Sequence, residues 1–315
     1  MTHCNFAVSP LLLILLLPAC ASSRAILFAS APLPLTDTTT IEVFAMQPDG
    51  SERRQLTRGR GQRKWSNFPV WSPDGRHIAY QVVPVGHPQN RTEIHIMDGT
   101  GGADRLLVRL DSADAAHPEW SPDGTRLLFT AYRAPITTPE IYTIRPDGSD
   151  LTRVPVDSGV YGVLAWEPDG RSFLTSRRLP SGRSEILRVA IATGQSRVVL
   201  KSDSLVLAVP STAPDGSAIV MQGALAGASR AVHVFLSNAD GTLLRRVTPD
   251  TGMHNFPRWS HDGRYIVMQC SMADLNVPHP GLTLYDTLEV CTVTRNGKRY
   301  RRVTRNSHTD VHPSW

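Results

Sequence analysis

The sequence repeats one short motif, Trp-Ser-Pro-Asp-Gly, and this repetition constrains the fold more than any other feature. Intact or degenerate copies occupy residues 71–75, 120–124, 166–170, 212–216 and 259–263. The last residue, Trp315, stands where one more copy would begin, and successive copies are 46 to 56 residues apart. A repeat of this period is typical of a protein that uses one supersecondary unit several times.

Each copy predicts a tight turn between two antiparallel strands. Proline presets φ, aspartate accepts local backbone hydrogen bonds, and glycine supplies the positive φ that the turn needs. Apolar runs such as residues 127–129 and 140–144 follow, then a second Asp-Gly or Asn-Gly turn, as at 147–148, and a last strand such as the one ending at Thr304. Four strands and two tight turns in about 45 residues form the pattern of a propeller blade.

The two ends of the chain predict how the ring closes. Residues 26–57 match strands two to four of a blade, and residues 308–315 match an innermost strand with nothing after it. Pairing them would complete one blade and hide the sheet edges that an open ring exposes. The sequence therefore predicts an all-β, six-bladed β-propeller with four-stranded antiparallel blades, at residues 26–57 with 308–315, 65–108, 114–155, 160–200, 204–248 and 252–304.

Residues 1–19 predict a secretory signal peptide, because they carry no Lys, Arg, Asp or Glu and their apolar core, residues 11–17, is too short to span a bilayer. Cys20 ends a Leu-Pro-Ala-Cys sequence that resembles a bacterial lipobox, whose cysteine is lipidated. Cleavage beside Ala19 would also suit a freely secreted protein. The predicted organisation is signal peptide 1–19, tether 20–25 and one propeller 26–315, located in the periplasm, on the outer membrane as a lipoprotein, or secreted.

The composition agrees with a globular exported domain. It is 41% hydrophobic and 19% charged, with a net charge of +5, which is enough apolar content for a full core. Cys270 and Cys291 fall on the second and third strands of the last predicted blade, which are antiparallel neighbours. Disulfides persist outside the cytoplasm, so a bridge and two separate buried thiols both remain open.

Three segments, residues 67–75, 117–124 and 255–263, resemble the WD-like propeller repeat of TolB. With the ring closure, the resemblance covers nearly all of the chain after the predicted tether. It implies the propeller fold and a place in the bacterial envelope. It does not fix the function, because similar repeats occur in envelope scaffolds, in prolyl-oligopeptidase-type peptidases and in oligogalacturonide-lyase-like proteins. Strand pattern begins at Ile26, so we expect no α/β domain before the propeller of the kind that TolB has.

Sequence motifs of the common catalytic classes are missing: there is no Gly-x-Ser-x-Gly, P-loop, His-Glu-x-x-His or paired Cys-x-x-Cys. Polar residues near the starts of the innermost strands could hold a divalent metal at the channel mouth, or could simply line a water-filled channel. These residues are Asp114, His117, His254, Asn255, His308, Asp310 and His312. The metal candidates are Asp114, His254, His308 and Asp310, but we expect no metal or other cofactor, because strand alternation turns several of these side chains away from the axis.

Two arginine-rich segments, residues 51–64 and 295–305, hold 12 of the 33 basic residues. Ring closure places them on adjacent blades, so we expect one merged basic patch that attracts an anionic partner. A solubilising surface is the alternative. The residues expected in the patch are Arg58, Arg60, Arg63, Lys64, Arg299, Arg301, Arg302 and Arg305.

The predicted blades also have two unlike faces. The Asp-Gly turns all emerge on one face, while the longer loops, including residues 84–91 and 271–286, emerge on the other, where binding is expected. The sequence thus predicts a monomeric, non-catalytic binding scaffold of the bacterial envelope, for a protein or an anionic glycan or lipid headgroup and not for nucleic acid. The alternative is a metal-dependent lyase or hydrolase of acidic polysaccharide with a His/Asp site at the channel mouth.

Overall fold

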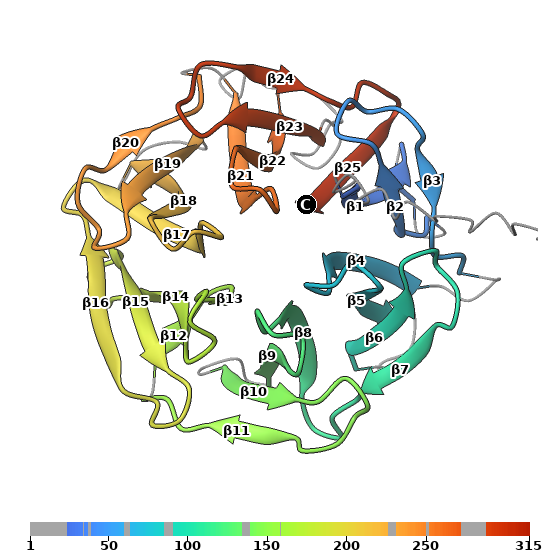
Figure 1. Ribbon diagram of the computed structural model, residues 1–315, viewed down its shortest axis with the longest axis horizontal. Helices are drawn as coiled ribbons and strands as arrows, with labels where there is room; N and C mark the ends of the chain where they lie inside the picture. The colour runs from blue at the N-terminus through green and yellow to red at the C-terminus, as the bar shows by residue number, and fades with distance from the viewer. Residues whose placement is uncertain are drawn as a thin grey trace, which may run out of the picture.

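The computed structural model describes residues 24–33, 35–36, 39–59, 64–84, 91–133, 139–157, 159–225, 231–249, 252–271 and 288–315. In these residues the chain forms strands β1 to β25, arranged as six sheets in a ring (Figure 1). No helix able to cross a membrane occurs in this described part. The prediction of an all-β, six-bladed propeller is confirmed.

The blades follow one another along the chain. Blade 1 contains β25 (His308–Ser314), β1 (Ile26–Pro32), β2 (Glu42–Met46) and β3 (Arg54–Gln55). Blade 2 contains β4 (Lys64–Trp71), β5 (His77–Pro84), β6 (Glu93–Asp98) and β7 (Arg105–Val108). Blade 3 contains β8 (Asp114–Trp120), β9 (Leu127–Tyr132), β10 (Glu140–Ile144) and β11 (Thr152–Val154).

The second half of the ring repeats this order. Blade 4 contains β12 (Val160–Tyr161), β13 (Ala165–Trp166), β14 (Ser172–Arg178), β15 (Ser184–Ala190) and β16 (Ser196–Lys201). Blade 5 contains β17 (Leu205–Thr212), β18 (Ala218–Leu225), β19 (Val232–Asn238) and β20 (Arg245–Arg246). Blade 6 contains β21 (Met253–Trp259), β22 (Tyr265–Ser271), β23 (Leu288–Thr294) and β24 (Tyr300–Arg302). Only blade 4 has its innermost strand split in two, β12 and β13, within the described residues.

Blade 1 closes the ring as the sequence predicts. β25 pairs with β1 in antiparallel register, with Ser314 opposite Leu27 and His308 opposite Pro32. The carboxylate of Asp310, fully buried, accepts a hydrogen bond from Ser30 Oγ at 2.6 Å and lies 3.6 Å from Arg53 Nη2. Asn306 Nδ2 donates to the other carboxylate oxygen at 2.9 Å. A buried polar network therefore reinforces the pairing of the two chain ends.

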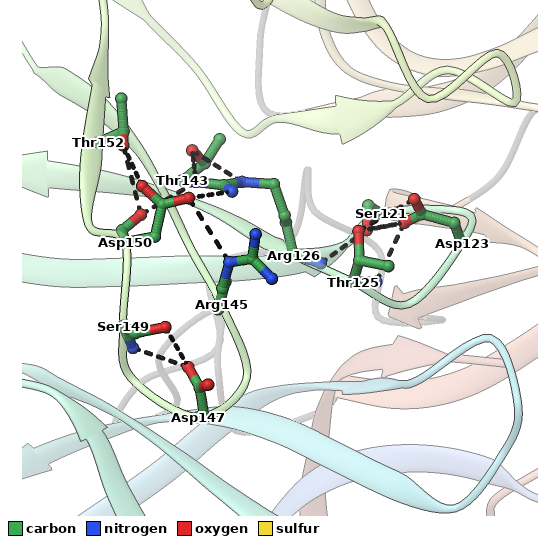
Figure 2. A network of polar contacts seen from close by, with 10 residues as sticks. All are labelled: Ser121, Asp123, Thr125, Arg126, Thr143, Arg145, Asp147, Ser149, Asp150 and Thr152. Atoms are coloured by element: carbon green, nitrogen blue, oxygen red, sulfur yellow. Dashed lines mark hydrogen bonds and ion pairs between the residues drawn. The ribbon is translucent and has the colours of Figure 1, made fainter.

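The Asp-Gly sequences form the turns that were expected of them, as blade 3 shows (Figure 2). Ser121 Oγ donates to Asp123 Oδ1 at 2.6 Å, and the backbone N–H of Thr125 donates to the same oxygen at 3.0 Å. In the next turn, Ser149 N donates to Asp147 Oδ1 at 2.8 Å. These short local bonds hold the chain reversed, so the aspartates are explained by turn formation.

The motif tryptophans pack between blades. Trp259 joins the cluster of buried residues formed by Val234 and Leu236 of blade 5 and Ile266 and Met268 of blade 6. Its indole N–H donates to the Ser211 carbonyl of the preceding blade at 3.0 Å. Trp71 and Trp166 make the same kind of bond, to Ala25 O at 2.8 Å and Glu119 O at 3.1 Å. The tryptophans thus join apolar burial to a fixed contact between neighbouring blades.

Cys270 and Cys291 are joined by a disulfide, with their Cα atoms 5.9 Å apart. On the paired strands β22 and β23, Cys270 lies opposite Glu289 and Cys291 lies opposite Met268. The two cysteines are therefore diagonal neighbours on one face of blade 6, a separation that side chains can bridge across a sheet.

Candidate functional site

The innermost strands share a distortion that shapes the centre of the ring. Five residues that precede a proline have positive φ between 49° and 54°: Phe68, His117, Val209, Phe256 and His312. The strand register shifts at each of these places. A β-bulge of this kind redirects the side chain of the extra residue. Positive φ is unfavourable for residues other than glycine, so the surrounding structure must hold each bulge in place.

Four of these side chains, Phe68, His117, Phe256 and His312, meet on the axis and are called the axial cluster below. Phe68 stacks on His312 with ring centroids 3.7 Å apart and meets the edge of His117 at 4.4 Å. Phe256 contacts His312 at 4.9 Å and Phe68 at 5.8 Å. The void among them and their neighbours is about 20 Å³. The expectation of polar residues around a water-filled channel is wrong at this level, because rings from four blades fill it.

Burial controls the charge of the two histidines in the axial cluster. It lowers the pKa of His117 to about 4 and that of His312 to about 3, with Arg258 adding to the first shift and His117 to the second. Both imidazoles are therefore neutral at pH 7. Their backbone N–H groups donate to glutamine side chains of the preceding blades: His117 to Gln81 Oε1 at 3.2 Å and His312 to Gln269 Oε1 at 3.1 Å.

An ion pair that the sequence analysis missed crosses the axis. Arg258 of blade 6 contacts the carboxylate of Glu119 of blade 3, and both side chains are about 15% exposed. Burial raises the pKa of Glu119, and Arg258 opposes this shift. Each residue directly follows the proline of its bulge, at equivalent places in two repeats. Opposite charges at equivalent positions of opposite blades were the signal that could have identified the pair.

Three of the four metal candidates are bonded to different partners. Asp310 belongs to the closure network, and Asp114 Oδ1 accepts a hydrogen bond from Thr92 N at 2.8 Å. His254 Nε2 lies 3.0 Å from the Tyr300 hydroxyl, and burial lowers the pKa of this histidine to about 4. His308 is half-buried at the start of β25. Among the residues that the structure describes, no group of three or more His, Cys, Asp or Glu could hold a metal ion.

The two arginine-rich segments meet at one point. A groove of about 440 Å³ between blades 6 and 1 is lined by Met46, Gly50, Arg53, Arg301, Arg302, Val303, Thr304, Arg305 and Asn306. We call it the closure groove. It joins Arg53 of the first segment to three arginines of the second, and Arg53 was not among the residues expected in the patch.

The other expected patch residues lie elsewhere. Arg58 and Lys64 line a separate hollow of about 780 Å³ between blades 1 and 2. Arg299, with Arg301, lines a third hollow of about 840 Å³ on the face that carries the Asp-Gly turns. Arg60 and Arg63 lie outside the described residues, as do the predicted signal peptide, Cys20 and most of both long loops. The closure groove and the third hollow share Arg301, while Arg58 and Lys64 line a separate hollow.

Two of the four arginines in the closure groove have buried acidic partners. Arg302 Nη2 lies 2.6 Å from Glu289 Oε1, and Arg53 reaches Asp310 and also covers the ring of Phe44 at 4.6 Å. Arg301 donates to the Asp49 carbonyl at 2.8 Å, and Arg305 is exposed. The excess positive charge of the groove therefore comes from Arg301 and Arg305.

Comparison with known proteins places this geometry among propellers. No family model matches the sequence. A TolB homologue of Chlorobium luteolum is 29% identical over 162 residues, which are 50% of this chain and 33% of that protein. Dipeptidyl-peptidase 5 of Trichophyton schoenleinii is 32% identical over 129 residues, or 38% of this chain and 17% of that enzyme. The match thus spans well under two thirds of either relative.

Among solved structures, TolB from Acinetobacter baumannii superposes with a TM-score of 0.74 at 20% identity, covering 93% of this chain and 67% of that one. At this identity the likeness concerns the fold, and it extends over all six blades. Together with the repeated Trp-Ser-Pro-Asp-Gly motif, it shows that this chain has the six-bladed β-propeller fold that is also found in TolB.

Proposed function

We propose that the protein is an exported, non-catalytic binding scaffold of the bacterial envelope, which binds an acidic protein surface in the closure groove. The likeness to TolB proteins supports a role in the envelope, and the leader sequence supports export. The rigid, closed ring supports a role in presenting a binding surface, because binding residues are commonly carried by a stable framework.

The observation that carries the proposal is the lining of the closure groove. Four arginines from segments far apart in the sequence surround it, and its lining contains no Asp or Glu among the described residues. Guanidinium groups bind carboxylates through paired, charge-assisted hydrogen bonds. An acidic protein surface therefore suits the groove better than a neutral one, and its binding would weaken as salt screens the charges.

The residues considered for metal-dependent catalysis have structural roles that favour the scaffold. Two histidines pack in the axial cluster as neutral rings, Asp310 holds the ends of the chain together, and His254 bonds to Tyr300. A general base or metal ligand needs an accessible lone pair directed at a substrate, and these contacts direct the side chains into the protein.

Photo-crosslinking from position 307, which is exposed and follows the groove residue Asn306, in the native bacterium would identify the partner. With the purified partner, we expect Arg305→Glu to weaken binding about tenfold, a loss of about 1.4 kcal/mol. Arg197→Glu, on the exposed outer strand of blade 4, is the matched control and should leave the affinity unchanged. Unchanged affinity of Arg305→Glu, or an equal loss in both variants, would refute the groove as the binding surface.

A further inference from the structure

The chain enters the propeller on the face that carries the Asp-Gly turns, which we call the turn face. Arg24 donates to the carbonyls of Ser72, at 3.2 Å, and Pro73, both in a turn of blade 2. The Trp71 indole donates to the Ala25 carbonyl at 2.8 Å. These contacts fix residues 24–25 at the turn face, so Arg24, to which the preceding segment is joined, lies on this face and not on the opposite one.

A basic surface surrounds this entry point. The hollow of about 840 Å³ on the turn face is lined by Arg24, Arg264, Arg299 and Arg301, and Lys298 is exposed in the same turn as Arg299. These five residues are called the tether patch. It lies on blades 6 and 1, together with Arg24 at the entry point.

The acidic residues of the hollow are engaged within the protein. Asp262 lies 2.5 Å from Arg264, and Asp49 accepts a hydrogen bond from Ser51 Oγ at 2.6 Å. Glu52 accepts one from Gln47 at 2.9 Å. Five cationic side chains against these three acids leave the patch with an excess of positive charge, which would attract an anionic surface.

The length of the tether connects this patch to a membrane. Cys20 precedes Arg24 by four residues, which span at most about 14 Å when fully extended. If Cys20 carries lipid, as the resemblance of residues 17–20 to a lipobox predicts, the turn face lies within that distance of the headgroups. This upper limit is less than twice the screening length at physiological salt, about 8 Å, and the separation is smaller whenever the tether is not fully extended, so the patch and the lipid charges would interact.

We propose that the tether patch docks the propeller on anionic phospholipid headgroups, with the turn face against the membrane. The opposite face would then be directed away from the lipid. The docking itself stands on residues of the propeller, and only the covalent anchor rests on the proposed lipidation of Cys20.

The first test uses full-length Cys20→Ala protein, which has no lipid, and vesicles of phosphatidylcholine with or without about one third phosphatidylglycerol. We expect sedimentation with the anionic vesicles only, and at least tenfold weaker binding for Lys298→Glu with Arg299→Glu. The control pair Arg171→Glu with Arg197→Glu, on blade 4, should bind like the parent. Equal losses in both pairs, binding to neutral vesicles, or displacement by millimolar glycerol phosphate would overturn the proposal.

The second test uses the three lysines of the chain. Lys298 lies on the turn face, whereas Lys64 begins β4 and Lys201 ends β16 on the opposite face. On anionic vesicles, amine labelling of lipidated wild-type protein should fall at Lys298 and stay unchanged at Lys201. Protection of Lys201 instead would reverse the orientation and refute the proposal.

Radiolabelled palmitate separates the two claims. If it fails to enter the protein, the covalent tether is wrong, while vesicle binding by Cys20→Ala protein still decides the docking surface. If palmitate enters but neither vesicle binding nor Lys298 protection depends on the patch, the tether stands and the docking proposal is refuted.

Discussion

His312 is a neutral imidazole held between phenylalanine rings at the centre of the molecule. It stacks on Phe68, meets the edge of Phe256, and fixes its own backbone N–H to Gln269 of the preceding blade. Its left-handed backbone is unfavourable by itself, and the prolines that follow such residues place all four axial rings at the same level. The packed side chains of the axial cluster therefore close the centre of the ring.

His312→Phe should reduce the acid sensitivity of the fold. Since burial lowers the pKa of His312 from 6.5 to about 3, the unfolded state binds more protons between these values. The stability that comes from burying His312 as a neutral imidazole is complete above pH 6.5 and is lost as the pH falls towards 3. Between pH 6.5 and 5 the wild type should lose about 2 kcal/mol more stability than the variant.

Urea unfolding at the two pH values measures this difference. Exposed His77→Phe serves as the control and should keep the pH dependence of the wild type. Some pH dependence of the unfolding free energy will persist in His312→Phe, because His117 and His254 also have lowered pKa values. An identical slope in His312→Phe and wild type would show that the ring is not buried as described.

At the scale of elements, a tight turn can do more than reverse the chain, because it can also contact the neighbouring blade. Gly194 of the turn between β15 and β16 has a φ of 69°, and a Cβ there would lie 1.8 Å from the Pro155 carbonyl of blade 3. Gly170, in another turn of the same blade, has a similar φ of 65° with no atom within 4 Å of its would-be Cβ. The two glycines therefore share a positive φ, but they differ in what a side chain at each position would contact.

These two glycines form a matched pair for mutation. Gly170→Ala should cost about 1 kcal/mol, from the left-handed backbone alone. Gly194→Ala carries the same penalty plus the overlap with blade 3, so we expect a total of about 3 kcal/mol. The free energy of unfolding in urea measures both. Equal losses would show that the turn does not press on blade 3.

For the whole molecule, closure of the ring depends on a buried acid. Asp310→Asn keeps the shape of the side chain but leaves Arg53 without its charge partner, so we expect a loss of about 3 to 5 kcal/mol in unfolding free energy. Asp114→Asn, at the start of β8, is the control, with an expected loss of about 1 kcal/mol for one hydrogen bond. A similar small loss in both variants would contradict the role given to the closure network.

Much of this architecture could be predicted from local sequence. Turn chemistry at Asp123 and Asp147 is contained in four or five residues, and the missing strand of blade 1 followed from the pattern at the two ends. The axial cluster could not be predicted, because a register shift before proline changes which side chains reach the axis. His117 and His312 were therefore expected beside water. The arginine segments were correctly placed on adjacent blades, but Arg58 lines the hollow between blades 1 and 2, whereas Arg301 lines the groove between blades 6 and 1.

The pairing of Ser30 with Asp310 joins positions 280 residues apart, and this distance affects how the protein is made. The ribosome synthesises blades 2 to 6 before it synthesises β25, the strand that completes blade 1. Until then β1 presents an open edge to any other extended chain, including a second nascent copy. A premature stop codon that removes only the last eight residues would leave five complete sheets and a sixth whose unpaired edge stays exposed.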